Sequence, residues 1–194
     1  MFKRKILSKL EAWKRDERHK PLILRGARQV GKTTVVNEFG SQFDNYLYFN
    51  LEMNESVRLF EMDIPLNDLV NMLFASLGKS QREGSTLIFI DEIQNSPKTI
   101  ALLRYFYEQR PDLYVIAAGS LLENLVDVNV SFPVGRVMYM ALRPCSFYEF
   151  LGAIGKTNLL AVLSQKPEYT VVFHEQLMHH FNQYTIIGGM PEAV

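Results

Sequence analysis

Eight consecutive residues near the start of the chain have the types and spacing of a triphosphate-binding loop. The segment Gly26-Ala27-Arg28-Gln29-Val30-Gly31-Lys32-Thr33 fits the phosphate-loop pattern G-x-x-x-x-G-K-[ST] at every fixed position. Glycines let the backbone wrap closely around phosphates and turn its N–H groups inward. The N-terminus of a following helix adds partial positive charge, so this segment predicts binding of ATP or GTP.

Three side chains at the end of this loop have separate expected roles. Lys32 is expected to neutralise the β and γ phosphates, and the Thr33 hydroxyl to ligate Mg²⁺. Thr34 is placed to contact the α phosphate. The alternative is a glycine-containing turn between a strand and a helix that binds nothing.

Two adjacent carboxylates, Asp91 and Glu92, follow the apolar run at 87–90. Because neighbouring side chains of an extended chain point to opposite sides, the two acids can serve two objects. We expect Asp91 to hold Mg²⁺ through a water, and Glu92 to orient and deprotonate the attacking water. Glu92 favours hydrolysis over nucleotide binding alone, whereas the alternative is an acidic, solvated turn. Gln94, just beyond the pair, is a candidate sensor of nucleotide state or a cap of the following turn.

Ser120 and Arg136 are further candidates for catalytic residues. Ser120 follows an apolar run, and doubly wound sheets bind ligands beyond the carboxyl ends of their strands. Its hydroxyl is therefore placed to contact the γ phosphate or the attacking water, or else to cap a helix. Arg136 precedes another apolar run, where it can reach the γ phosphate of a neighbouring subunit or lie on the surface.

Short apolar runs alternate with amphipathic segments along most of the chain. Strands are expected at 22–24, 46–49, 87–90, 113–118 and 137–142, and helices at 3–16, 33–39, 54–62, 65–77 and 97–109. This alternation predicts an α/β fold with a parallel sheet covered by helices on both faces. From Ser146 onward the spacing is helical, so we expect a phosphate-loop domain over residues 1–145 and a small helical lid over 146–194.

The composition excludes several classes of protein. Lys and Arg together number 21 and match 21 Asp and Glu, so no global charge attracts nucleic acid or an anionic membrane. No stretch of about 18 apolar residues predicts a membrane span. The charged N-terminal segment does not form a secretory signal, and the single cysteine, Cys145, cannot form an internal disulfide. We therefore expect a cytoplasmic protein.

Several short motifs occur in an order that resembles the AAA+-type ATPases of bacteria and archaea, close to the archaeal ATPase and STAND-like groups. After the phosphate loop they are Asp91-Glu92-Ile93-Gln94, Ala118-Gly119-Ser120, Gly135-Arg136-Val137, Leu142-Arg143-Pro144, Ser146-Phe147-Tyr148-Glu149-Phe150 and Gly188-Gly189-Met190-Pro191. The resemblance implies the sheet order 5-1-4-3-2, a sensor role for Ser120 and an arginine-finger role for Arg136. It also implies a further C-terminal domain with a nuclease-like fold, of which this chain holds at most the start. The phosphate-sensing arginine that many such ATPases carry on the lid is not evident after Arg143.

Together these features predict hydrolysis of ATP with Mg²⁺, with the nucleotide state driving a conformational change. One alternative is a nucleotide-gated switch or scaffold with slow or no hydrolysis. A metabolite kinase is another, although no Arg-rich substrate lid lies between the strands. The expected partners are the nucleotide, a second copy of the chain, and DNA or a protein through the C-terminal domain, with no membrane.

Overall fold

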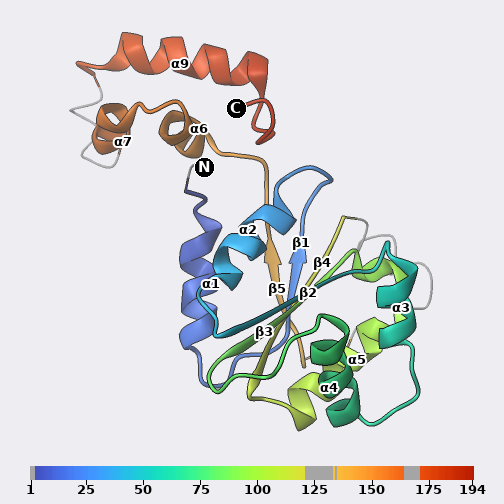
Figure 1. Ribbon diagram of the computed structural model, residues 1–194. Coiled ribbons are helices and arrows are strands. Elements are labelled where there is room, and N and C mark those ends of the chain that lie inside the picture. The colour runs from blue at the N-terminus through green and yellow to red at the C-terminus, as the bar shows by residue number, and fades with distance from the viewer. Residues whose placement is uncertain (1–2, 121–132, 134, 164–170) are drawn as a thin grey trace.

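The computed structural model describes residues 3–120, 133, 135–163 and 171–194 (Figure 1). Its centre is a parallel sheet of five strands in the order β2-β3-β4-β1-β5. The strands are β1 (Leu22–Arg25), β2 (Asn45–Asn50), β3 (Thr86–Asp91), β4 (Leu113–Gly119) and β5 (Met138–Ala141). This is the predicted order read from the other edge, so the expected α/β fold and strand order are confirmed.

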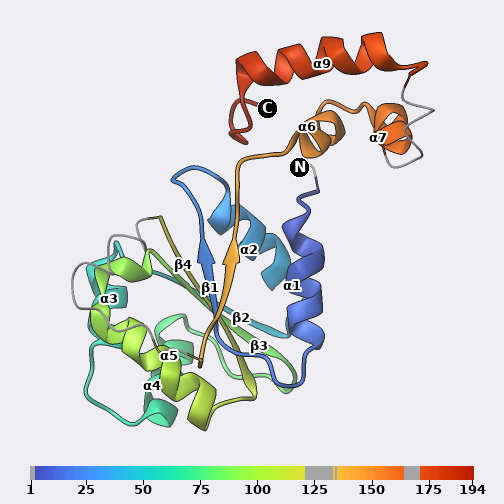
Figure 2. The same ribbon diagram turned by 180° about the vertical axis from the view of Figure 1, so that it is seen from behind.

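Helices cover both faces of the sheet (Figures 1 and 2). One face carries α1 (Ile6–Arg15) and α2 (Lys32–Gly40). The other carries α3 (Asn54–Phe60), α4 (Leu66–Ser76) and α5 (Pro97–Gln109). Each observed helix ends within about three residues of the predicted bounds, because end turns depend on local caps that periodicity does not detect.

The strand sequences explain this three-layer arrangement. Side chains of a strand alternate between the two faces, and in β1 Leu22 and Leu24 pack toward α1 and α2, whereas Ile23 packs toward α4 and α5. All three side chains are fully buried. A strand buried on both faces reads as a continuous apolar run, as β1 and β3 do.

The start of α5 shows how local residue types set the beginning of a helix. Ser96 caps the helix, its Oγ accepting a hydrogen bond from the Thr99 N–H at 3.3 Å, and Pro97 occupies the first helical position. A short 3₁₀ turn, η1 (Ile93–Asn95), precedes this cap and was not predicted.

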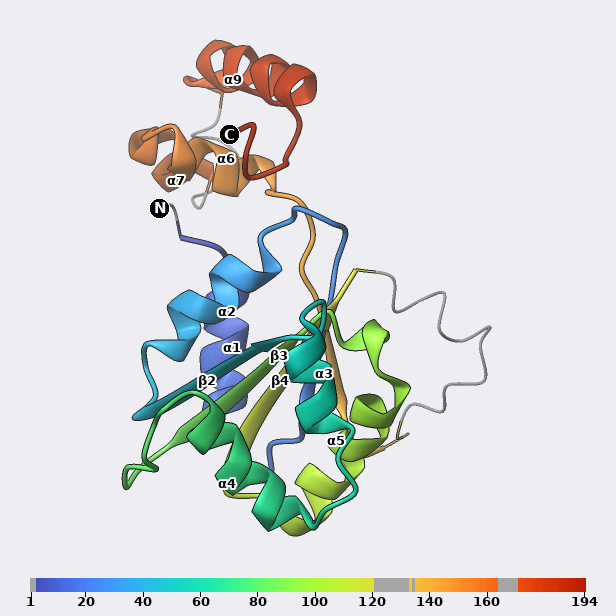
Figure 3. The same cartoon turned by 45° about the vertical axis from the view of Figure 1, so that its right-hand side comes forward.

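The C-terminal helices lie beyond the end of the sheet toward which β1 and β5 point (Figures 2 and 3). They are α6 (Phe147–Ala153), α7 (Thr157–Leu163) and α9 (His174–Ile187), and they share a small core around Leu151, Leu159 and Leu177. None of the helices in the described part of the chain has the length and apolar character that a bilayer span requires.

Candidate active site

The phosphate-loop residues join β1 to α2 at the carboxyl end of the sheet. Gly31 has a φ of 88°, in the left-handed region that glycine adopts without strain. A Cβ on Gly26 would lie 2.4 Å from the Leu142 carbonyl oxygen, so only glycine fits there. Steric demands of the fold thus account for both fixed glycines of the pattern.

Lys32 extends its side chain along the inside of the loop. Its Nζ donates hydrogen bonds to the carbonyl oxygens of Gly26 and Ala27, both at 2.9 Å, and the residue is buried. Burial lowers the pKa of Lys32, while the charges of Glu92 and Asp91 act in the opposite direction. The ammonium group therefore lies where the loop and the two acids meet.

Asp91 and Thr33 are in direct contact at this point. The Thr33 hydroxyl donates a hydrogen bond to Asp91 Oδ2 at 2.6 Å, and Asp91 is only 3% exposed. Burial raises the pKa of the Asp91 carboxyl, and the hydrogen bond from Thr33 partly offsets this. A hydroxyl and a carboxylate oxygen side by side are ligands that Mg²⁺ prefers, so this donor set fits the ion.

Glu92 lies at the same site, but for a different reason from the one expected. β3 ends at Asp91, and Glu92 has φ 53° and ψ 44°, so the side-chain alternation of an extended strand does not continue through it. The expectation that the two acids separate to opposite sides of a strand is therefore wrong. Glu92 lines a cavity of about 230 Å³ together with Lys32, Thr33 and Thr34. Left-handed backbone at a non-glycine residue is strained, and such strain concentrates at functional sites.

Gln94 contacts the Glu92 side chain. Its Nε2 donates a hydrogen bond to Glu92 Oε2 at 2.5 Å. Its own Oε1 is buried and has no hydrogen-bond partner among the described residues. Gln94 therefore restrains one of the two Glu92 carboxylate oxygens.

Ser120 and Arg136 lie at opposite ends of the strands. Ser120 directly follows β4, which lies between β3 and β1, so it is at the carboxyl end of the sheet, where the phosphate loop also lies. Arg136 precedes β5, and its Nε donates to Glu108 on α5 at 2.6 Å. The structure therefore does not bring Arg136 to the cavity of its own chain, and a role toward a neighbouring subunit stays a prediction.

Sequence reasoning overlooked Tyr48 on β2. Burial raises the pKa of the Tyr48 hydroxyl, and the neighbouring Asp91 carboxylate raises it further. Its ring also stacks on Phe89, with centroids 5.3 Å apart. The alternating pattern of β2 placed Tyr48 on one face of the sheet, but only the pairing of β2 with β3 reveals its neighbours.

The C-terminal segment forms the outer wall of the cavity, which sequence reasoning also missed. Pro191 and Glu192 line it together with Arg28 and Gln29. The segment is held by a hydrogen bond from the Cys145 N–H to the carbonyl of Gly189, at 2.6 Å. The sequence feature that corresponds to this wall is the Gly188-Gly189-Met190-Pro191 stretch, which indicated the family resemblance but not a position at the cavity.

Comparison with known proteins gives a family and a fold. Residues 18–151 match a family model described as AAA domain. Uncharacterized protein MJ1637 of Methanocaldococcus jannaschii is 23% identical over an alignment 206 residues long, gaps included, which covers 97% of this chain and 42% of the relative. Uncharacterized protein MJ1544 of the same organism is 22% identical, covering 88% of this chain and 35% of the relative. The chain therefore spans less than half the length of these two relatives.

A solved structure supports the same fold. The Walker-type ATPase PABY2304 of Pyrococcus abyssi superposes with a TM-score of 0.56 at 18% identity, over 98% of this chain and 65% of that one. At this identity the likeness concerns the fold alone.

Proposed function

This chain belongs to the AAA domain family, and we propose that it binds ATP and hydrolyses the bond between the β and γ phosphates. The observation that supports this most directly is the Thr33–Asp91 contact at 2.6 Å beside a cavity lined by Lys32 and Glu92. One end of the sheet thus holds a cation, a hydroxyl and a carboxylate of the kind that bind Mg²⁺, and a second carboxylate that can act as a base.

Each of these residues has its own role in the proposed reaction. The loop N–H groups and Lys32 hold the phosphates, and Thr33 and Asp91 would hold Mg²⁺. When bound, the ion neutralises charge on the phosphate oxygens. Glu92 accepts a proton from water as the water oxygen bonds to the γ phosphorus. The bond from that phosphorus to the bridging oxygen breaks at the same time, and ADP leaves with the electron pair.

The C-terminal helical unit is proposed to act as a lid on this site. Helices α6, α7 and α9 lie beyond the end of the sheet that carries the loop, and Pro191 and Glu192 line the cavity. Nucleotide in the cavity would contact both parts of the chain, and differential contact is what shifts a conformational equilibrium. Membership of the STAND-like group, a cytoplasmic location, homo-oligomers and a DNA or protein partner are further proposals, based on the sequence.

A nucleotide-gated switch with slow hydrolysis is the second candidate function. The Gln94–Glu92 hydrogen bond favours it, because one oxygen of the proposed base is already engaged. A metabolite kinase has no comparable observation in its favour.

The test is phosphate release from ATP and Mg²⁺ without any added acceptor. Hydrolysis predicts turnover by the wild type, and loss of turnover with retained ATP binding in Glu92→Gln. A switch predicts tight binding with little turnover in either protein. A kinase predicts no release until an acceptor is supplied.

A further inference from the structure

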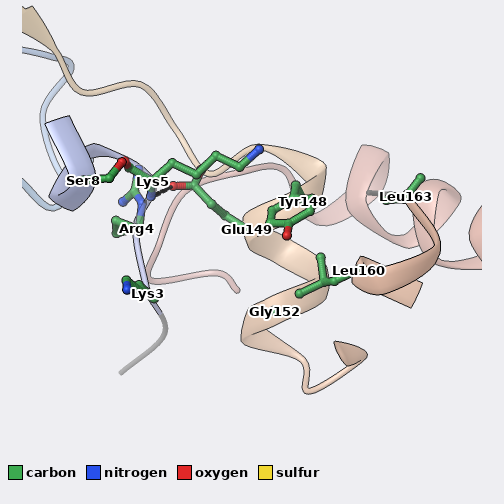
Figure 4. Close-up of a pocket in the computed structure, with 9 residues that line it drawn as sticks. All are labelled: Lys3, Arg4, Lys5, Ser8, Tyr148, Glu149, Gly152, Leu160 and Leu163. Atoms are coloured by element: carbon green, nitrogen blue, oxygen red, sulfur yellow. Dashed lines mark hydrogen bonds and ion pairs between the residues drawn. The ribbon is translucent and has the colours of Figure 1, made fainter. Parts of the chain in front are cut away.

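Arg4 lies far from the phosphate-loop pattern in sequence, yet its guanidinium contacts the loop. The residue precedes α1 and is only 5% exposed. Nη1 donates a hydrogen bond to the Val30 carbonyl at 3.0 Å, and Nη2 donates to the Arg143 carbonyl at 2.7 Å. Nε pairs with Glu149 Oε1 at 3.1 Å (Figure 4). One buried side chain thus joins the loop, the linker after β5, and α6.

The contact with Val30 bears on phosphate binding through the geometry of one peptide group. The Val30 C=O and the Gly31 N–H belong to the same planar unit, and in a trans peptide they point in opposite directions. The hydrogen bond from Arg4 holds this carbonyl oxygen on the side of the peptide opposite the Gly31 N–H. The Gly31 N–H is therefore directed the other way, as a phosphate-binding amide must be.

Glu149 in turn fixes the position of Arg4. Oε1 accepts hydrogen bonds from Arg4 Nε and from the Lys5 N–H, the latter at 2.8 Å. Oε2 accepts from the N–H and the hydroxyl of Ser146, at 2.8 and 3.0 Å, which completes a capping box at the start of α6. The anion that pairs with Arg4 is thus part of the first turn of a C-terminal helix.

A guanidinium is required for this arrangement. Its planar fork presents donors to three acceptors in fixed directions, whereas a lysine ammonium is a single compact charge on a flexible stem. Arg4 serves acceptors on three separate segments at once.

We propose that Arg4 is a positioning residue for phosphate binding, held in place by Glu149, so that nucleotide affinity depends on two residues outside the loop. The inference depends on the proposed function, because it assumes that the loop binds a nucleotide. Arg4 does not touch the phosphates in this scheme. It acts through the peptide that carries the Gly31 N–H.

The test measures dissociation constants of fluorescent ATP and ADP analogues, with Mg²⁺, for five proteins. They are the wild type, Arg4→Lys, Glu149→Gln, Leu7→Ala and, as the reference for lost binding, Lys32→Ala. Glu149→Gln keeps the length of the side chain and its ability to cap α6, while it removes the charge facing Arg4. Leu7 is a residue of α1 whose N–H bonds to the Arg4 carbonyl but whose buried side chain packs in the core, so Leu7→Ala keeps the backbone contact and controls for loss of stability alone.

We expect Arg4→Lys to weaken the binding of both ATP and ADP about 10-fold, which is the scale of a lost hydrogen bond to a charged group. Glu149→Gln should weaken the binding of both nucleotides by a smaller factor. Leu7→Ala should bind them with wild-type affinity at temperatures where it is folded. Wild-type affinity in both Arg4→Lys and Glu149→Gln would overturn the inference. If Arg4→Lys does not fold, wild-type affinity in Glu149→Gln is by itself enough to overturn the inference. Equal weakening in Leu7→Ala at a matched Tm would also overturn it. No binding by the wild type, measured against Lys32→Ala, would instead refute the proposed function.

Discussion

Replacing Gly26 by alanine tests whether close packing of the backbone shapes the phosphate loop. The added Cβ would lie 2.4 Å from the Leu142 carbonyl oxygen and 3.0 Å from Val30 Cγ1. An ordinary contact begins at 3.4 Å, so the loop and the chain at Leu142 must separate by about 1 Å. Leu142 cannot yield freely, because its N–H donates to the Arg25 carbonyl at 2.7 Å and ties it to the end of β1.

The expected cost follows from overpacking. Forcing extra volume into a packed site costs about 1–3 kcal/mol in the free energy of unfolding. For a chain of this size that lowers the Tm by about 2–12 °C. A 1 Å displacement in a positioned site also costs up to about 100-fold in function, so nucleotide affinity should fall at least 10-fold.

The assay combines urea unfolding with titration of a fluorescent ATP analogue. Gly152→Ala is the matched control, because among the described residues a Cβ there meets only Leu160 Cδ1, at 3.5 Å, and Gly152 lies inside α6. It should raise stability by about 0.4–1 kcal/mol without changing affinity. Wild-type stability and affinity in Gly26→Ala would refute the steric reasoning.

Two further predictions concern Glu149 and Gln94. Burial alone would raise the pKa of Glu149, but hydrogen bonds from Ser146, Lys5 and Arg4 outweigh it and lower this pKa below its ordinary value of 4.5. A carboxyl with a lowered folded-state pKa stabilises the fold above its unfolded pKa and loses that contribution as the pH falls. The Tm difference between wild type and Glu149→Gln should therefore shrink from about pH 6 to about pH 3.5, and a constant difference would contradict the role of the charge. Gln94→Ala frees Glu92 Oε2 and should raise phosphate release at saturating ATP by about 2- to 10-fold, whereas an unchanged rate would show that the contact restrains nothing.

The phosphate loop and the strands could be predicted from the sequence because they depend on residues that are close together along the chain. The phosphate loop could be predicted because sterics and phosphate chemistry restrict residue types at fixed spacing, and Gly26 and Gly31 meet those demands. The strands could be predicted because burial on both faces leaves a continuous apolar run. The strand order is a tertiary property, and it came from family resemblance.

The features that sequence reasoning missed depend on contacts between distant segments. Arg4 and Glu149 are 145 residues apart, and nothing local distinguishes Arg4 from the other basic residues near the N-terminus. Glu92 adopts left-handed backbone that its residue type disfavours, so propensity predicts the opposite. Tyr48 approaches Asp91 only because β2 pairs with β3.

The central claim is that Glu92 activates water at a site where Lys32, Thr33 and Asp91 hold the nucleotide. The most direct measurement is phosphate release by Glu92→Gln at saturating ATP and Mg²⁺, with ATP affinity determined on the same samples. We predict a loss of at least about 100-fold in turnover, typical of removing a general base, with affinity unchanged. Release at the wild-type rate would contradict it.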